Sequence, residues 1–170
     1  MLDAANPIPD GSSGPRADAG MALLSVENLQ VEFQTGRGRL RAVDGLSFAV
    51  RRGEIVAIVG ESGSGKSVSA LSIMRLLPRQ TGRIVGGRIV FDGRDLGKLA
   101  DEAMRALRGR EISMIFQEPM TSLNPILTVG FQIVEPLRIH LGMDEAQAKA
   151  RAVELMGLVG IPDAERRLGQ

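Results

Sequence analysis

Apolar and polar residues alternate over much of residues 24–50. Because successive side chains of a strand point to opposite faces of a sheet, this pattern predicts two antiparallel strands joined across residues 35–39. Residues 82–93 have a similar character and predict a further antiparallel strand, with turns at Gly86-Gly87 and Asp92-Gly93. We therefore expect an antiparallel sheet in the first half of the chain.

Two other segments predict the core strands of an α/β domain. Residues 55–59 form a continuous apolar run rich in β-branched residues, which is typical of a strand buried on both faces. Residues 111–116 predict the second core strand, which Pro119 closes. Residues 89–92 are an apolar run that ends in a carboxylate, Asp92, as does a core strand whose final carboxylate orders Mg²⁺. The Asp-Gly turn signal argues against such a strand there.

Apolar residues at helical spacing predict helices at residues 67–77, 101–108, 127–141 and 144–158. Asp144 is well placed to cap the last of these, and the last two carry apolar stripes that suit an antiparallel pair. His140 is the single histidine and lies late on its helix. An interaction with the helix dipole is the favoured role, because nothing nearby in the sequence could orient the ring for catalysis.

Composition narrows the class of protein. The chain has 170 residues, no cysteine and a net charge of +1. This length suits one domain, or one domain with an arm. The absence of cysteine excludes disulfides. The small net charge creates no strong electrostatic field that would favour nucleic acid as a partner. No apolar run approaches the roughly 20 residues that span a bilayer. Residues 1–22 combine prolines with small polar residues and predict a disordered arm, with Met21 as an alternative start of translation.

The strongest chemical signal lies between the 55–59 strand and the 67–77 helix. It fills the Walker A pattern G-x-x-x-x-G-K-[ST] with the residues Gly60-Glu61-Ser62-Gly63-Ser64-Gly65-Lys66-Ser67. A loop of small residues can turn successive backbone N–H groups toward phosphate oxygens, and the start of the following helix adds positive partial charge. We expect Lys66 to bind the β and γ phosphates of a triphosphate and the Ser67 hydroxyl to bind Mg²⁺.

Two residues outside this loop are candidates on less specific grounds. Gln117 follows the second core strand, where a neutral amide facing the loop could reach Mg²⁺ or a water molecule. A polar strand cap explains Gln117 equally well. Phe33 lies near the end of its strand, where a place in the core of the sheet is the ordinary role.

The motifs resemble the ATP-binding subunits of ABC transporters. The Walker loop with Val68 is similar to the oligopeptide, dipeptide, nickel and glutathione importer branch, as is the string Ile115-Phe116-Gln117-Glu118-Pro119-Met120-Thr121-Ser122-Leu123-Asn124-Pro125. The resemblance covers residues 23–170. It implies an α/β fold with a P-loop NTPase core, an N-terminal antiparallel β-subdomain and the start of a helical subdomain, incomplete at the C-terminus. The implied boundary places the β-subdomain and P-loop core in residues 23–117, and the Q-loop with the first helices in residues 118–170.

The resemblance also implies roles for single residues. Phe33 falls where the family has an aromatic residue that stacks on adenine. Gln117 falls on the Q-loop glutamine, which contacts Mg²⁺ or the attacking water, so Gln117 joins Lys66 as a catalytic candidate. Residues 60–68 would bind the nucleotide. The segment from residue 118 to 141 corresponds to the surface that receives a permease coupling helix, although Phe131 stands where the branch usually has Glu.

The implied function is import of peptides or related solutes, driven by ATP with Mg²⁺ at the cytoplasmic face of the membrane. The implied partners are transmembrane permease subunits, a second ATP-binding subunit and, indirectly, a periplasmic or extracellular solute-binding protein. In the family, a stretch like residues 166–170 is followed by the signature motif, the Walker B strand, the catalytic glutamate and the switch histidine. Two alternatives therefore remain: a nucleotide-binding fragment without turnover, and another P-loop ATPase. The sheet ahead of the loop and the Gln117 string count against the second.

Overall fold

The structure is a computed structural model that describes residues 22–117 and 122–170. Its described residues up to Leu99 form one compact unit, and Ala100–Gln170 form another. Except for Ala22, the predicted N-terminal arm lies outside the described residues, as does Met21. The predicted subdomain boundary after residue 117 stays a prediction.

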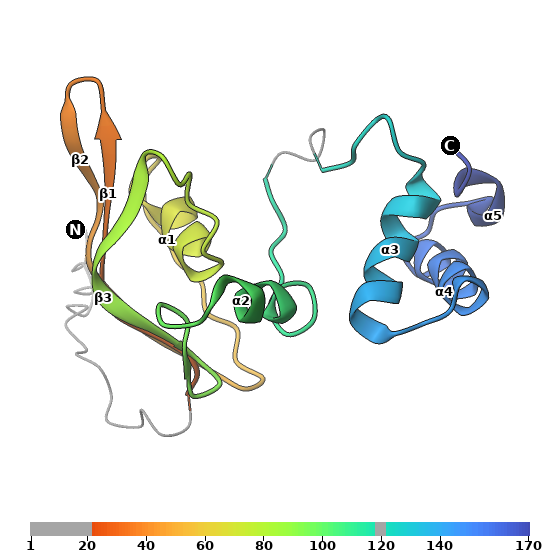
Figure 1. The fold of residues 1–170 in the computed structure, drawn as a ribbon, viewed down its shortest axis with the longest axis horizontal. Coiled ribbons are helices and arrows are strands. Elements are labelled where there is room, and N and C mark those ends of the chain that lie inside the picture. The colour runs from red at the N-terminus through yellow and green to blue at the C-terminus, as the bar shows by residue number, and fades with distance from the viewer. Residues whose placement is uncertain (1–21, 118–121) are drawn as a thin grey trace, which may run out of the picture. The chain divides into compact units, whose positions relative to one another are not determined.

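The first unit contains an antiparallel sheet whose strand order is β2-β1-β3-β4. Figure 1 labels β1, β2 and β3. The strands are β1 (Ala22–Thr35), β2 (Gly38–Arg51), β3 (Gly82–Phe91) and β4 (Arg94–Asp95). Strand β1 pairs with β2 up to the turn between Thr35 and Gly38, which confirms the two strands predicted over residues 24–50. The alternation is explained by burial, since Val26, Leu29 and Val31 are almost inaccessible to solvent.

The predicted turn at Gly86-Gly87 is wrong. Strand β3 continues through both glycines, pairing with β1 at Glu27–Arg88 and again at Gln30–Gly86. Gly87 has φ of +88°, and a Cβ there would lie 2.4 Å from the carbonyl oxygen of Asn28. Glycine is therefore needed for a close approach at an irregularity in the ladder, and not for a reversal of the chain. The turn predicted at Asp92-Gly93 is confirmed, because it joins β3 to β4.

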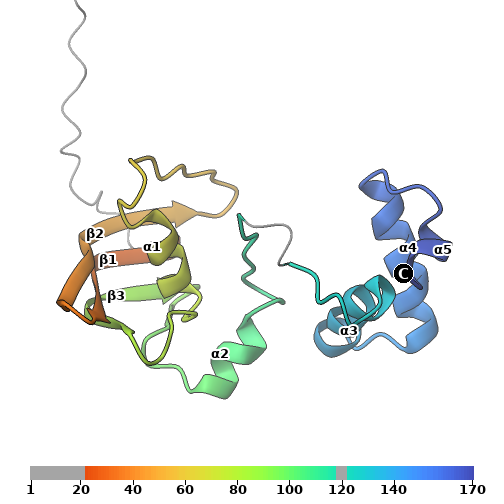
Figure 2. The ribbon, with the colours of Figure 1, turned by 90° about the horizontal axis from the view of Figure 1, so that it is seen from above.

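Helix α1 (Lys66–Ile73) lies against one face of the sheet (Figure 2). The buried apolar side chains of this unit are Val26, Leu29, Val31, Val43, Ile73, Met74, Ile89, Phe91 and Leu96. The helix is shorter than the predicted 67–77 segment, since Met74 is its C-cap and Arg75 has a positive φ of 50°. A left-handed residue cannot continue a right-handed helix.

The core strands predicted at residues 55–59 and 111–116 are not formed. Ile55 is 97% exposed and Ile115 is 98% exposed, and neither segment joins a ladder with a strand among the described residues. A parallel bridge between Arg108 and Ile112 is the single β-contact there within the described part of the chain. A strand exists only with a partner, because its N–H and C=O groups need one, and apolar sequence alone does not supply it.

The second unit is helical, with α2 (Asp101–Leu107), α3 (Val129–Leu141), α4 (Glu145–Leu158) and α5 (Ala164–Arg167). Helices α3 and α4 pack through Val134, Ala148 and Ala152. Asp144 caps α4 as predicted, in a capping box with Gln147. His140 lies in the last turn of α3. None of the helices in the described ranges is both long enough and apolar enough to cross a bilayer.

Candidate phosphate-binding site

The loop that carries the Walker pattern ends at Gly65, the N-cap of α1. Gly65 has φ of +88°, and a Cβ at this position would lie 2.4 Å from the carbonyl oxygen of Ala42 in β2. Both observations require glycine: the conformation is left-handed, and the backbone of the loop lies directly against a strand. Contact with the sheet therefore fixes the point at which the loop becomes a helix.

Lys66 is the first residue of α1, and its side chain folds back over the loop. Its Nζ atom donates to the carbonyl oxygens of Gly60 at 2.7 Å and Glu61 at 2.6 Å, and to the Ser64 hydroxyl at 3.2 Å. These are the three donors of an ammonium group, and all of them point into the loop. The loop thus closes around a positive charge, and strong acceptors such as phosphate oxygens could replace the loop oxygens as its hydrogen-bond partners.

The start of α1 adds to this positive potential. Its first turn has no acidic residue and no side-chain cap within the described part of the chain. The partial positive charge of the helix N-terminus therefore remains available to an anion. The buried Ser69 hydroxyl donates to the Gly65 carbonyl at 2.9 Å, so it stabilises the join between loop and helix.

Ser67 follows Lys66 in the first turn of α1 and is exposed. Among the described residues there is no cluster of His, Cys, Asp or Glu that could hold a metal ion by itself. A single hydroxyl beside a phosphate cradle suits Mg²⁺, because this ion keeps several of its waters and binds through substrate phosphates and few protein ligands. The residues present therefore fit a magnesium ion that arrives with a nucleotide.

The other candidates lie in different parts of the chain. Phe33 is half-buried in β1, opposite Gly82 of β3, and a Cβ on Gly82 would lie 2.9 Å from its ring. Phe33 therefore packs in part on the sheet, and its ring is not fully covered. Gln117 is exposed and lies in the second unit, whereas the Walker loop lies in the first.

Sequence reasoning missed Arg75, which anchors the end of α1. Its guanidinium donates to the carbonyl oxygens of Leu96 at 3.2 Å and Leu99 at 2.6 Å. These contacts hold the helix of the Walker loop to the segment after β4. No sequence signal could have found them, because the partners are main-chain atoms more than twenty residues away.

The sequence profile of the ABC transporter family matches residues 43–170, from β2 through the Walker loop to the last helix. The chain belongs to the ABC transporter family. The match covers well over half of the sequence and contains both the loop and the helical unit. The resemblance inferred from the two motifs is thereby confirmed.

Individual ABC transporter proteins are also similar to this chain. It is 51% identical over 156 residues to the "Probable peptide ABC transporter ATP-binding protein y4tR" of Sinorhizobium fredii, covering 92% of this chain and 46% of that protein. It is 49% identical over 148 residues to the dipeptide transport ATP-binding protein DppD of Escherichia coli, covering 87% and 45%. The chain therefore spans about half the length of these relatives.

Among solved structures, the chain resembles the ATP-binding cassette MJ0796 in a dimeric post-hydrolysis state bound to ADP and Pi. The TM-score is 0.73 at 23% sequence identity, covering 86% of this chain and 60% of that chain. At this level of identity the likeness establishes the fold. The predicted ABC cassette fold is confirmed, with an antiparallel sheet whose strands β1 and β2 precede the phosphate loop and whose strands β3 and β4 follow it; the two predicted core strands are the exception.

Proposed function

We propose that this chain is the nucleotide-binding part of a subunit that uses ATP to drive the import of peptides or related solutes. The observation that carries the proposal is Lys66, whose ammonium lies inside the Walker loop at the start of α1. The relatives named for peptide or dipeptide transport support the solute class.

Different residues of the loop bind the phosphates and the metal ion. Residues 60–68 surround the phosphates with small side chains, backbone donors and the start of α1. Lys66 exchanges its contacts to Gly60 and Glu61 for phosphate oxygens, so it places a positive charge where negative charge accumulates during γ-phosphate transfer. Ser67 offers its hydroxyl to Mg²⁺, which supplies charge compensation at the phosphates when bound.

Two residues complete the proposed site. Phe33 presents the exposed part of its ring to the adenine base, while Gly82 supports the other part. Gln117 contacts Mg²⁺ or the attacking water through its side-chain amide, and it connects the nucleotide to the helical unit. Its exposure leaves the amide free to approach a ligand.

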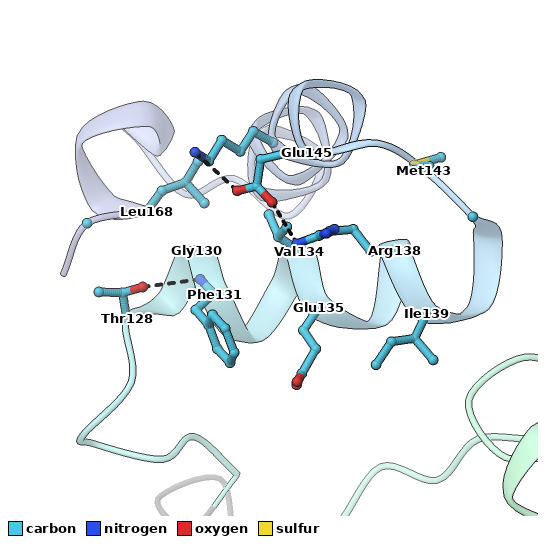
Figure 3. A pocket seen from close by; sticks show the side chains of 13 residues that line it. Thr128, Gly130, Phe131, Val134, Glu135, Arg138, Ile139, Met143, Glu145 and Leu168 are labelled. Carbon is cyan, nitrogen blue, oxygen red and sulfur yellow. Dashed lines mark hydrogen bonds and ion pairs between the residues drawn. The ribbon is translucent and has the colours of Figure 1, made fainter.

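Helix α3 carries the proposed contact surface for a permease. Phe131, Glu135 and Ile139 follow one another along one side of this helix and are exposed (Figure 3). They border a hollow of about 790 Å³. Phe131, which replaces the Glu usual in the branch, faces outward and does not pack in the core, so an apolar contact with the permease is the proposed role. Further proposed partners are a second ATP-binding subunit and, indirectly, a solute-binding protein, with the subunit peripheral at the cytoplasmic face of the membrane.

The test uses the full-length subunit, assembled with its permease subunits in vesicles and supplied with the solute-binding protein. Peptide-dependent ATP hydrolysis and peptide uptake are measured together. We expect the peptide to stimulate hydrolysis and uptake to require ATP. Nucleotide binding without turnover would instead favour the alternative of a binding protein. Hydrolysis that peptide and permease leave unchanged would favour a different P-loop ATPase.

A further inference from the structure

We propose that Gln132 is a positioning residue that makes α3 and the loop before it one rigid body. The proposal rests on the function proposed above, because α3 carries the surface that is proposed there to contact a permease. Gln132 lies in the second turn of α3 and is half-buried. Its side chain points back toward the chain that leads into the helix.

The side-chain amide of Gln132 pairs with the main chain of Asn124 at two points. The Asn124 N–H donates to Gln132 Oε1 at 2.7 Å, and Gln132 Nε2 donates to the Asn124 carbonyl at 3.0 Å. This is the pairing that a neighbouring strand would offer. The amide therefore satisfies the Asn124 N–H, and it shares the Asn124 carbonyl oxygen with the Leu127 N–H, which donates to it at 3.2 Å.

The same side chain also holds the rest of the loop. Gln132 Nε2 donates to the carbonyl oxygens of Leu127 at 3.0 Å and Thr128 at 3.3 Å. The Asn124 side chain accepts from the N–H of Ile126 at 3.0 Å, so the loop is also closed on itself. A single amide thus ties residues 124–128 to the helix that follows them.

The first turn of α3 is held from a second direction. The N–H groups of Val129 and Gly130 donate to the carbonyl oxygens of Gln170 and Leu168, each at 2.8 Å, and the Phe131 N–H donates to the Thr128 hydroxyl. Helix N-termini normally leave these N–H groups without an internal partner. Here other parts of the chain satisfy them, so the start of α3 is fixed on both sides.

This arrangement has a mechanical consequence. The segment that begins at Ser122 enters α3 through the loop that Gln132 holds. A loop tied at four hydrogen bonds passes a displacement on to the helix, whereas a loose loop absorbs it. Phe131 and Ile139 belong to that helix, so the surface of α3 that is proposed to contact a permease would move with the loop.

The decisive variant is Gln132→Met, which keeps the length of the side chain and removes every amide contact. The matched control is Gln147→Met, because the Gln147 side chain accepts from the Asp144 N–H in the capping box of α4. Both changes remove hydrogen bonds near a helix start, so a purely structural role predicts similar behaviour for the two variants. Both are made in the full-length subunit assembled with its permease.

We expect Gln132→Met to retain the wild-type ATP dissociation constant and solute-independent hydrolysis, and to lower solute-stimulated hydrolysis about tenfold, within the usual range of coupling between sites. Gln147→Met should keep the stimulation. Wild-type stimulation in Gln132→Met, or a parallel fall in both rates, would overturn the proposal. If the wild-type assembly shows no stimulation, the proposed function fails separately, and hydrogen exchange then decides on Gln132.

Hydrogen exchange tests the rigid body without reference to transport. In Gln132→Met, the amides of Asn124 and Ile126 should exchange about tenfold faster than in the wild type, because their loop loses its ties to α3. The amides of α4 should keep their protection. Unchanged exchange at Asn124 and Ile126 would refute the positioning role.

Discussion

The amide of Gly130 donates to the carbonyl oxygen of Leu168 at 2.8 Å, and a Cβ on Gly130 would lie 2.7 Å from the same oxygen. The two main chains approach so closely that no side chain fits between them. Gly130→Ala should therefore lower the stability of the full-length subunit by about 1–3 kcal/mol, the usual cost of overpacking. Urea denaturation measures this change.

Gly157→Ala is the control for that experiment. Gly157 lies inside α4, and a Cβ there would meet no atom within 4 Å. Alanine should stabilise the helix by up to about 1 kcal/mol through its higher propensity. If the two variants shifted stability in the same direction, the contact between Gly130 and Leu168 would not be the cause.

A second pair of glycines tests the Walker loop. Gly63 and Gly65 both have positive φ, but a Cβ on Gly63 would meet open space, whereas one on Gly65 would collide with Ala42 of β2. Each alanine should cost about 1–2 kcal/mol for the left-handed conformation. Gly65→Ala should cost more, and it should also weaken ATP binding more. Equal effects on stability would argue against the contact with β2.

Phe33→Leu separates stacking on a base from packing on the sheet. Leucine keeps most of the apolar volume beside Gly82 but has no aromatic face. If Phe33 stacks on adenine, the free energy of ATP binding should weaken by about 1–3 kcal/mol. Stability should change by less than about 1.5 kcal/mol, since the substitution is close to volume-conserving. An unchanged ATP dissociation constant would assign Phe33 to the core alone.

Ser67→Ala tests the magnesium contact. With Mg²⁺ in excess, the variant should bind ATP about tenfold more weakly, the size of one lost polar contact. With the metal removed by a chelator, wild type and variant should bind ATP equally. Titration calorimetry under both conditions gives the comparison. A defect that persists without Mg²⁺ would show that the Ser67 hydroxyl acts on the phosphates or on the fold instead.

The sequence predicted elements whose determinants are local. The alternation over residues 24–50 and the cap at Asp144 depend on neighbours in the chain, and both are confirmed. Residues 55–59 have the composition of a buried strand, but forming a strand depends on a partner that composition does not encode. Gly87 has the residue type of a turn because the ladder irregularity at this position uses a positive φ, as many turns do.

The residues of the candidate site also differ in whether local sequence determines their role. Lys66 and the glycines around it were predictable, because their spacing along one loop is itself the motif. Arg75 and Gln132 were missed, because each acts on main-chain carbonyls whose positions are set by folding. One signal was available for Gln132: a polar side chain four residues after Thr128 in a helix can reach back to the loop before it.

In the proposed function, Lys66 and its loop hold the phosphates of ATP. The most direct measurement is the ATP dissociation constant of the full-length subunit with Lys66→Ala, beside Lys98→Ala, which removes an exposed lysine of the same unit. Since each charge-assisted hydrogen bond contributes about 1.5–3 kcal/mol, Lys66→Ala should weaken binding by roughly 100-fold or more, and Lys98→Ala should not. Undiminished affinity in Lys66→Ala would contradict the account.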